Sequence, residues 1–372
     1  MTKLKVILRF IRSRKIRYIN DLKIIRDFIV AWIVGSSIYS LITYLILEEV
    51  NYSLYTAKEW IIYSLSVGFV IGFLNGLFEV VLFNRLFNKM KFVYVVLNKT
   101  LFFFIAFIFT VMFYILFKNY ILIPAGITLS KEVDGFIEVF QSNLVMRHAL
   151  VGLIINFMIN FFMQVKRKMG KGVLLNLFLG RYHRPRREER IVMFLDLTSA
   201  TAIAEKLDLY KYSSFLKDFF YDIDDAINET KGAIFQFVGD EVVILWHPKD
   251  GNENNNCINF FFKAQKVIRD HKAIYLEKYG VFPQFKAGLH FGTVVITEVG
   301  GSKQEIAYHG DTINTTARIR STCNQFKECL LVSAELLSRL NDLDKSYSVE
   351  SVGVANFKGK AHVVGLFGVR QK

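Results

Sequence analysis

Four long apolar runs limit what this chain can fold into more than any other feature. They cover roughly residues 28–47, 60–83, 96–117 and 144–165. Each is long enough to cross a bilayer as a helix, which takes about 20 residues. Soluble proteins bury such helices against amphipathic partners, and no such partners accompany these runs. We therefore predict a multi-pass α-helical membrane domain over residues 1–165, with four transmembrane helices and the lipid bilayer as a partner.

The distribution of Lys and Arg predicts how these helices are oriented. Residues 1–27 and 166–190 carry nine Lys or Arg each, and the loop 84–91 carries three more. The loops 48–59 and 118–143 are slightly acidic. Because positive loops stay on the cytoplasmic side, we expect both termini in the cytoplasm of a plasma (inner) membrane protein.

The net charge of +14 does not indicate a nucleic-acid partner. Residues 191–372 carry 21 Lys or Arg against 22 Asp or Glu, so the excess lies next to the apolar runs. The three cysteines, all in this second half, show no metal-binding spacing and are interpreted as reduced thiols. Residues 166–188 form a basic juxtamembrane linker, in which Gly180 and Pro185 limit any continuous helix.

Four charged or titratable residues lie in or near the apolar runs. Lys99 and Arg147 are near run ends, where long side chains are expected to extend to the membrane surface. Glu79 and His148 are weaker candidates for a sensing role, because intramembrane polar groups can mark functional sites.

Two acidic residues stand out against apolar, strand-forming surroundings in the second half. Ile191–Leu197 reads as a buried strand with Asp196 as its only charge, and Phe235–Trp246 reads as a hairpin with Gly239 and Asp240 at its turn. Taken alone, Asp240 would usually lie in a solvated turn, and Asp196 would usually cap a helix. If the strands are neighbours, however, the two carboxylates converge and suit Mg²⁺, which prefers oxygen ligands.

Further along, the pattern predicts more elements of an α+β fold. Residues 211–229 form an amphipathic helix, and residues 284–299 are expected to form a second hairpin broken at Phe291-Gly292. Gly310-Asp311 is expected to end a strand and cap a helix, on which Asn314 and Arg318 share a face. An amide beside a guanidinium suits a sugar and a phosphate, although by themselves these two would more often be plain surface residues.

The order of these motifs resembles the class III adenylate and guanylate (nucleotidyl) cyclase catalytic domain. The matching pieces are F-L-D-L-x-x-x-T, F-V-G-D-E, G-L-H-x-G and Y-H-G-D-x-I-N-x-x-A-R, and they run from about residue 189 to the end. The resemblance implies a ferredoxin-like α+β domain over residues 189–372 with a central, mostly antiparallel sheet. It also implies an enzyme, a phosphorus-oxygen lyase of intracellular signalling, as in bacterial membrane-anchored cyclases.

The resemblance assigns roles to residues. Asp196 and Asp240 match metal ligands for two Mg²⁺ or Mn²⁺ ions per active site. Asn314 matches the residue that orients the ribose, and Arg318 the one that stabilises the reacting phosphate, both supplied across a homodimer interface. The remaining matched substrate-binding positions are Leu197, Thr198, Ser199, Ala200 and Thr201 in a phosphate-binding turn, Gly239 in the hairpin, and Lys358 at the terminal phosphates.

Two positions depart from the family pattern. Gln236 stands where adenylate cyclases have lysine and guanylate cyclases glutamate, and Ala307 stands where adenylate cyclases usually have aspartate or threonine. Glutamine can donate or accept, so it does not choose a base. The expected function is a membrane-bound cyclase that converts ATP to a 3′,5′-cyclic nucleotide and pyrophosphate. GTP or a pyrimidine triphosphate, a degenerate nucleotide-binding module, and a transporter with a regulatory domain remain alternatives.

Overall fold

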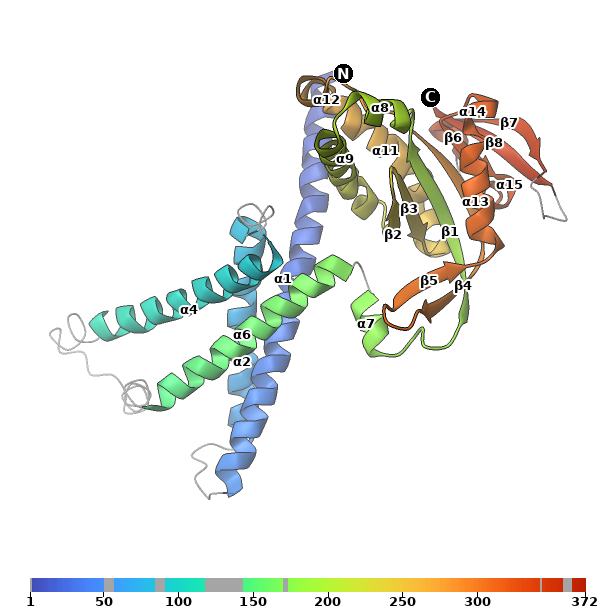
Figure 1. Ribbon diagram of the computed structural model, residues 1–372. Helices are drawn as coiled ribbons and strands as arrows, with labels where there is room; N and C mark the ends of the chain where they lie inside the picture. Colours follow the sequence, from blue (N-terminus) through green and yellow to red (C-terminus); the bar gives the residue numbers. More distant parts are fainter. Residues whose placement is uncertain are drawn as a thin grey trace. The chain divides into compact units, whose positions relative to one another are not determined.

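The computed structural model describes residues 2–49, 57–83, 91–117, 143–169, 173–341, 343–356 and 363–372. The chain divides into two compact units, Met1–Met169 and Gly170–Lys372, which are described separately here (Figure 1).

The first unit consists of long helices that coincide with the four apolar runs. They are α1 (Thr2–Glu49), α2 (Ala57–Phe78) continuing as the π-helix η1 (Glu79–Phe83), α4 (Phe92–Phe117) and α6 (Asn143–Met169). Three segments are long and apolar enough to cross a membrane: Asp21–Leu45, Ser64–Phe83 and Ala149–Met169. The apolar helical segment described in α4, Phe92–Ile105, is shorter than these three. The fourth transmembrane helix therefore stays a prediction.

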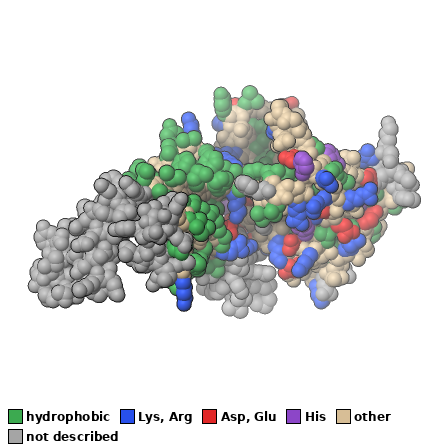
Figure 2. All heavy atoms as spheres, turned by 90° about the horizontal axis from the view of Figure 1, so that it is seen from below, with side chains coloured by type: hydrophobic (Ala, Val, Ile, Leu, Met, Phe, Trp, Pro, Cys, Tyr) green, Lys and Arg blue, Asp and Glu red, His purple; other side chains and the backbone are tan. Residues whose placement is uncertain are grey.

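Helices α1 and α2 pack closely because α2 carries glycine at every fourth position. A Cβ atom added to Gly72 would lie 2.6 Å from the Cα of Ile29, and one added to Gly68 would lie 2.7 Å from the Cα of Ile33. Small residues at this spacing let two helix backbones approach in an apolar environment. Outside this contact, large hydrophobic side chains of the unit are exposed (Figure 2), as expected of a surface that meets lipid.

Charged side chains inside this unit pair with one another. The Nζ of Lys99 lies 2.5 Å from Oε2 of Glu79, both residues are buried, and Arg167 approaches Oε1 of the same carboxylate at 3.8 Å. The expectation that Lys99 extends to the membrane surface is therefore wrong, because a buried carboxylate is within reach. The side chains of Arg147 and His148 lie outside the described residues.

The second unit is an α+β domain built on one mostly antiparallel sheet, as predicted. The strand order is β2-β3-β1-β4-β6-β8-β7, with β5 added to β4, and only the β4–β6 pair is parallel. The strands are β1 (Arg186–Leu197), β2 (Ala233–Val238), β3 (Glu241–Trp246), β4 (Phe285–Val299), β5 (Glu305–His309), β6 (Leu330–Ser333), β7 (Tyr347–Ala355) and β8 (Val364–Gln371).

Helices connect the strands of this sheet. The longer ones are α9 (Leu209–Glu229), α11 (Asn256–Asp270), α12 (Lys272–Tyr279) and α13 (Asp311–Ser321). The shorter ones are α7 (Val173–Phe178), α8 (Ala200–Lys206), α10 (Pro248–Asn252), η3 (Glu253–Asn255), α14 (Cys323–Phe326), α15 (Ala334–Leu337) and η4 (Leu343–Lys345).

Both faces of the central strands are covered, which explains why β1 reads as a continuous apolar run. Met193 and Leu195 belong to the main core with side chains of α9 and α11, whereas Val192 and Phe194 pack towards α13. Figure 1 shows α9 and α11 on one side of the sheet and α13 on the other. The apolar face predicted for residues 211–229 is the face of α9 that enters this core.

One sequence prediction about the sheet was wrong. Residues 284–299 do not form a hairpin broken at Phe291-Gly292, because β4 is one unbroken strand that pairs with β1 from Leu197 to Arg186. Its glycines serve close packing rather than a turn. A Cβ on Gly288 would lie 2.4 Å from the backbone nitrogen of Arg320, and one on Gly292 would lie 2.5 Å from Oγ1 of Thr312. They let α13 lie directly on the sheet.

Candidate functional site

The ends of β1 and of the β2–β3 hairpin bring two aspartates together. Asp196 pairs with Glu241 in the β1–β3 register, and Glu241 directly follows the two-residue turn Gly239-Asp240. Gly239 has φ +62°, a conformation that favours glycine in a hairpin turn. Asp196 and Asp240 lie close enough for Asp240 to raise the pKa of the Asp196 carboxyl group. The predicted convergence of these two side chains at one sheet edge is present in the fold.

The electrostatic environment makes Asp196 an unusual carboxyl group. Its pKa is raised from 3.8 to about 6. Burial is the largest cause, the guanidinium of Arg320 opposes it, and the neighbouring acids Asp240 and Glu241 add to the increase. Burial also raises the pKa of Glu241, again against Arg320. Crowded, partly buried carboxylates hold protons tightly because each disfavours the charge of the other. A cation placed among them would relieve this cost.

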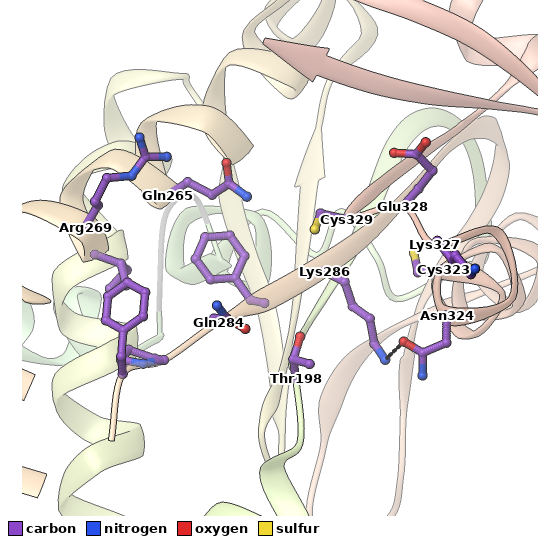
Figure 3. Close-up of a pocket in the computed structure, with 14 residues that line it drawn as sticks. Thr198, Gln265, Arg269, Gln284, Lys286, Cys323, Asn324, Lys327, Glu328 and Cys329 are labelled. Carbon is purple, nitrogen blue, oxygen red and sulfur yellow. Dashed lines mark hydrogen bonds between the residues drawn. The ribbon is translucent and has the colours of Figure 1, made fainter. Parts of the chain in front are cut away.

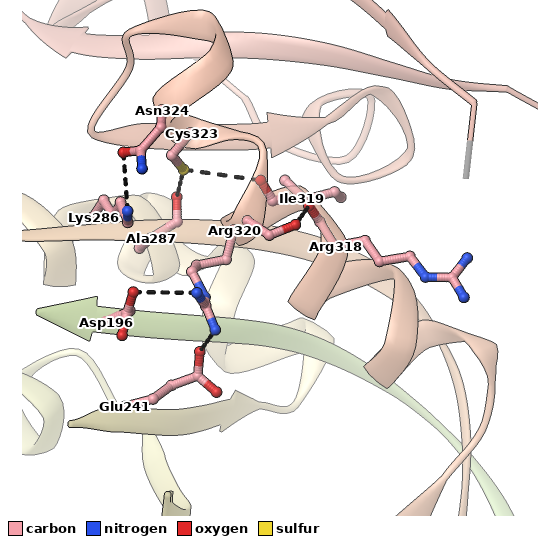
Figure 4. Close-up of polar contacts among 10 residues, drawn as sticks. Asp196, Glu241, Lys286, Ala287, Arg318, Ile319, Arg320, Cys323 and Asn324 are labelled. Atoms are coloured by element: carbon pink, nitrogen blue, oxygen red, sulfur yellow. Dashed lines mark hydrogen bonds and ion pairs between the residues drawn. The ribbon is translucent and has the colours of Figure 1, made fainter. Parts of the chain in front are cut away.

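The sequence reasoning missed Arg320, which supplies such a cation (Figure 4). Its Nη1 lies 3.2 Å from Oδ2 of Asp196, and its Nη2 forms an ion pair with Glu241. The only signal in the sequence was a second arginine two positions after Arg318 on the same helix. Because 124 residues separate Arg320 from Asp196, no local pattern could reveal the contact.

The donor set of this edge fits a hard divalent cation. Asp196 and Asp240 offer carboxylate oxygens only, which is the chemistry that Mg²⁺ and Mn²⁺ select. Among the residues that the structure describes, no group of three or more His, Cys, Asp or Glu side chains is arranged to hold an ion. Two carboxylates suit a site that water and substrate phosphates would complete, as is usual for Mg²⁺.

Asn314 and Arg318 lie on α13 but do not face these carboxylates. Asn314 is exposed and Arg318 is half-buried. In Figure 4 the side chain of Arg318 extends away from Asp196, whereas that of Arg320 extends towards it. Residues two apart on a helix are rotated by about 200°, so the two arginines must point to opposite sides. Within one chain, the predicted phosphate-stabilising residue is therefore directed away from the predicted metal ligands.

The predicted phosphate-binding turn connects β1 to α8. Leu197 is buried, the backbone N–H of Thr198 donates to the carbonyl of Gln284 at 2.7 Å, and Ser199 adopts a left-handed conformation with φ 59°. Helix α8 begins at Ala200, and Thr201 is exposed. The turn thus follows Asp196 directly and exposes Ser199 and Thr201.

The predicted base-reading residues lie on different strands. Gln236 is exposed on β2, just after an irregularity in its pairing with β3, and Ala307 is half-buried on β5 opposite Thr297. The neighbouring rings of Phe235 and Tyr308 pack with centroids 4.7 Å apart, which ties the two strands together. Lys358, the predicted contact to the terminal phosphates, lies outside the described residues.

A separate hollow of about 660 Å³ opens beside the turn (Figure 3). Thr198 is the only predicted site residue in its wall, and Lys286, whose Nζ donates to Oδ1 of Asn324 at 2.9 Å, lies across from it. Neither Asp240 nor Asn314 lines this hollow, so it is distinct from the carboxylate edge.

Comparison with known proteins agrees with the fold and the motifs. Residues 183–367 match the family model described as the adenylate and guanylate cyclase catalytic domain. Adenylate cyclase 2 of Rhizobium meliloti is 33% identical over 206 residues, which is 55% of this chain and 56% of that protein. A receptor-type guanylate cyclase of Caenorhabditis elegans is 26% identical over 198 residues, 52% of this chain and 19% of that protein.

A solved structure supports the fold. The match to the structure of a bacterial light-regulated adenylyl cyclase covers 58% of this chain and 62% of the cyclase chain, with a TM-score of 0.50 and 18% sequence identity. The chain spans about half the length of the Rhizobium relative and less of the nematode one. The family match, residues 183–367, lies within the second unit.

Proposed function

Because residues 183–367 belong to the adenylate and guanylate cyclase catalytic domain family, we propose that this chain is a membrane-bound nucleotidyl cyclase. It converts a nucleoside triphosphate, with ATP as the first candidate, to a 3′,5′-cyclic nucleotide and pyrophosphate. The single observation that carries this proposal is the position of Asp196 and Asp240 at one edge of the sheet, since Asp196 pairs with Glu241 and Asp240 precedes Glu241 in the hairpin turn.

In this proposal each part of the edge has a task. Asp196 and Asp240 hold two Mg²⁺ or Mn²⁺ ions, which when bound supply positive charge at the attacking and leaving oxygens. The turn Leu197–Thr201 binds phosphate oxygens, and Asn314 orients the ribose. The 3′-oxygen loses its proton and forms a bond to the α-phosphorus, while the bond to the pyrophosphate oxygen breaks. Arg318 stabilises the charge that develops on that phosphate.

A homodimer completes the site. Arg318 extends away from Asp196 of its own chain, so it is suited to reach the carboxylate edge of a second copy. A symmetric pair of chains would then form two equivalent composite sites, each with carboxylates from one copy and the Asn314/Arg318 face from the other.

The base is the least constrained part of the proposal. The Rhizobium relative named adenylate cyclase is the more similar one, which favours ATP, while a guanylate cyclase also matches. Exposed Gln236 can donate or accept, and Ala307 offers no polar side chain. GTP and pyrimidine triphosphates are therefore included among the substrates to be tested.

The three apolar helices support a location in the plasma (inner) membrane. The charge distribution favours a cytoplasmic position for both termini and for the catalytic domain. The nucleotide then comes from the cytoplasm, where the cyclic product would act as a signal.

A product assay tests the proposal. Detergent-solubilised protein is incubated with ATP, GTP, CTP or UTP and with Mg²⁺ or Mn²⁺, and cyclic product and pyrophosphate are quantified. Equal amounts of the two products from at least one triphosphate, lost in the Asp240→Ala variant, are expected. Absence of cyclic product with all four would favour a nucleotide-binding module without turnover.

A further inference from the structure

We propose that Arg320 is an internal counter-cation that holds Asp196 before a divalent ion binds and thereby sets how tightly that ion is bound. This rests on the proposed function, because it concerns the same carboxylate edge. Arg320 acts through Asp196 and is a positioning residue.

The contacts of Arg320 support this role. Its guanidinium bridges two strands, with Nη1 at 3.2 Å from Oδ2 of Asp196 on β1 and Nη2 paired with Glu241 on β3. Since Asp196 and Glu241 are directly opposite in the register, one planar guanidinium can reach both. Arg320 thus occupies an oxygen of the carboxylate that the proposed function assigns to a metal ion.

The backbone of Arg320 packs directly against β4, so we expect the side chain rather than the backbone to move when a metal ion binds. Gly288 of β4 lies so close to it that a Cβ there would come within 2.4 Å of the Arg320 backbone nitrogen. The Nε of Arg320 is buried and makes no hydrogen bond to any part of the chain that the structure describes. An unsatisfied buried donor makes the present side-chain position a costly one.

The neighbouring charges offer the Arg320 side chain a second position. The guanidinium of Arg320 pairs with two carboxylates, Asp196 and Glu241, and a third, Asp240, interacts with both of these acids. A divalent ion between Asp196 and Asp240 repels Arg320, which can leave Asp196 and remain on Glu241 because Glu241 already holds its other nitrogen. Metal binding therefore exchanges one cation for another at Asp196, and the exchange weakens the apparent affinity for the metal.

The two arginines of α13 have separate tasks in this scheme. Arg318 extends away from the carboxylates of its own chain and is assigned to the substrate by the proposed function, whereas Arg320 extends towards those carboxylates. Replacing Arg320 should therefore change metal binding without any nucleotide being present, which separates its role from that of a group that contacts the substrate.

The test is a titration of the full chain in detergent with Mn²⁺ alone, with free Mn²⁺ followed by electron paramagnetic resonance. Arg320→Gln should bind Mn²⁺ about fivefold to tenfold more tightly, because a partly buried ion pair no longer competes. Glu241→Gln should bind it roughly threefold more weakly, since Arg320 then has only Asp196 as its partner.

Matched variants control for charge and folding. Lys286→Gln removes a cation from the residue opposite Asp196 on β4, but Lys286 bonds to Asn324, so its affinity should equal that of the wild type. Arg320→Lys keeps the charge but cannot bridge two carboxylates as a fork, and it should bind Mn²⁺ about twofold to threefold more tightly. This variant keeps the test decisive if Arg320→Gln does not fold.

The outcomes separate this inference from the function on which it rests. Mn²⁺ binding that Asp240→Asn abolishes but that Arg320→Gln and Arg320→Lys leave unchanged, or weaken, overturns the role of Arg320 while the metal site stands. Wild-type protein that binds no Mn²⁺ overturns both.

Discussion

The two units of this chain bury charge in opposite ways. In the first unit one carboxylate, Glu79, meets two cations, Lys99 at 2.5 Å and Arg167 at 3.8 Å. In the second unit Asp196 and Glu241 share the single guanidinium of Arg320, and a third acid, Asp240, interacts with both of them. The first cluster has its negative charge fully matched, whereas the second has too little positive charge for its acids.

This difference distinguishes a charge cluster with a structural role from one that can bind a ligand. A matched, buried ion pair has nothing left to bind, and its role is to fix which helices pack together. A cluster with excess carboxylate is costly in the folded protein unless something positive joins it, and such costs are typical of functional sites. The excess of carboxylate at Asp196 suits the binding of a cation, which the proposed function identifies as Mg²⁺ or Mn²⁺.

Removal of a carboxylate from the unmatched cluster should have the largest effect. Asp240→Ala is expected to lower cyclase turnover by roughly 1,000-fold, because several kcal/mol of transition-state stabilisation depends on the metal it holds. Turnover and the circular dichroism spectrum are measured together, and the fold should be retained. Asp225→Ala, at an exposed position of α9, is the control and should be fully active. Near-normal activity of Asp240→Ala would remove the metal assignment.

Removal of the carboxylate from the matched cluster should instead cost stability. Glu79→Gln leaves Lys99 buried without its counter-charge, a change worth roughly 3 kcal/mol. The melting temperature in detergent is expected to fall by several degrees. The double variant Glu79→Gln/Lys99→Met, which removes both charges, should recover most of the loss. A single variant as stable as the wild type would contradict the interpretation of this pair as structural.

The unmatched cluster should also respond to pH. Because the pKa of Asp196 is about 6 in the folded protein against 3.8 as the ordinary value, the metal-free fold holds this proton more tightly than the unfolded chain does. The resulting stabilisation is present below about pH 4 and is lost as the pH rises through about 6.

Metal binding follows the reverse trend, since the ion must displace the proton. The affinity for Mn²⁺ should fall by about tenfold per pH unit below pH 6 and level off above about pH 7. Titrations between pH 5 and 8 measure this, and an affinity that does not change over that range would count against a shared proton at Asp196.

The smallest effect is expected on the preference for one nucleotide base over another. Gln236→Lys should raise the ratio of ATP to GTP turnover, and Gln236→Glu should lower it, each by about threefold to tenfold. The total rate should change less, because Gln236 is exposed on β2 and is not one of the proposed metal ligands. Competition assays with both triphosphates measure the ratio, and an unchanged preference would discard the role given to this residue.

Local chemistry made part of the fold predictable. The β2–β3 hairpin follows from Gly239-Asp240 between β-branched runs, and the convergence of Asp240 with Asp196 follows from neighbouring strands. The break predicted at Gly292 failed because a glycine in a strand can mark a turn or a close contact. Only the packing of Thr312 against it shows which one applies.

The residues of the candidate site that stand in sequence motifs were predictable. The contacts that depend on tertiary packing were not. Asp196, Asp240, Asn314 and Arg318 stand in sequence patterns, whereas the contact of Arg320 depends on how closely α13 lies on β4. The spacing of Lys99 from Glu79 likewise gave no sign of a bond, because the two residues lie on different helices and no local period connects them.

The most direct test of the shared site is complementation between two inactive variants. Asp240→Ala and Arg318→Ala chains are co-expressed in equal amounts, and cyclic nucleotide production is compared with each variant alone. Random pairing makes about half of the dimers mixed, each with one intact composite site, so about a quarter of wild-type activity is expected. If the mixture were no more active than either variant alone, carboxylates and arginine would not meet across two chains.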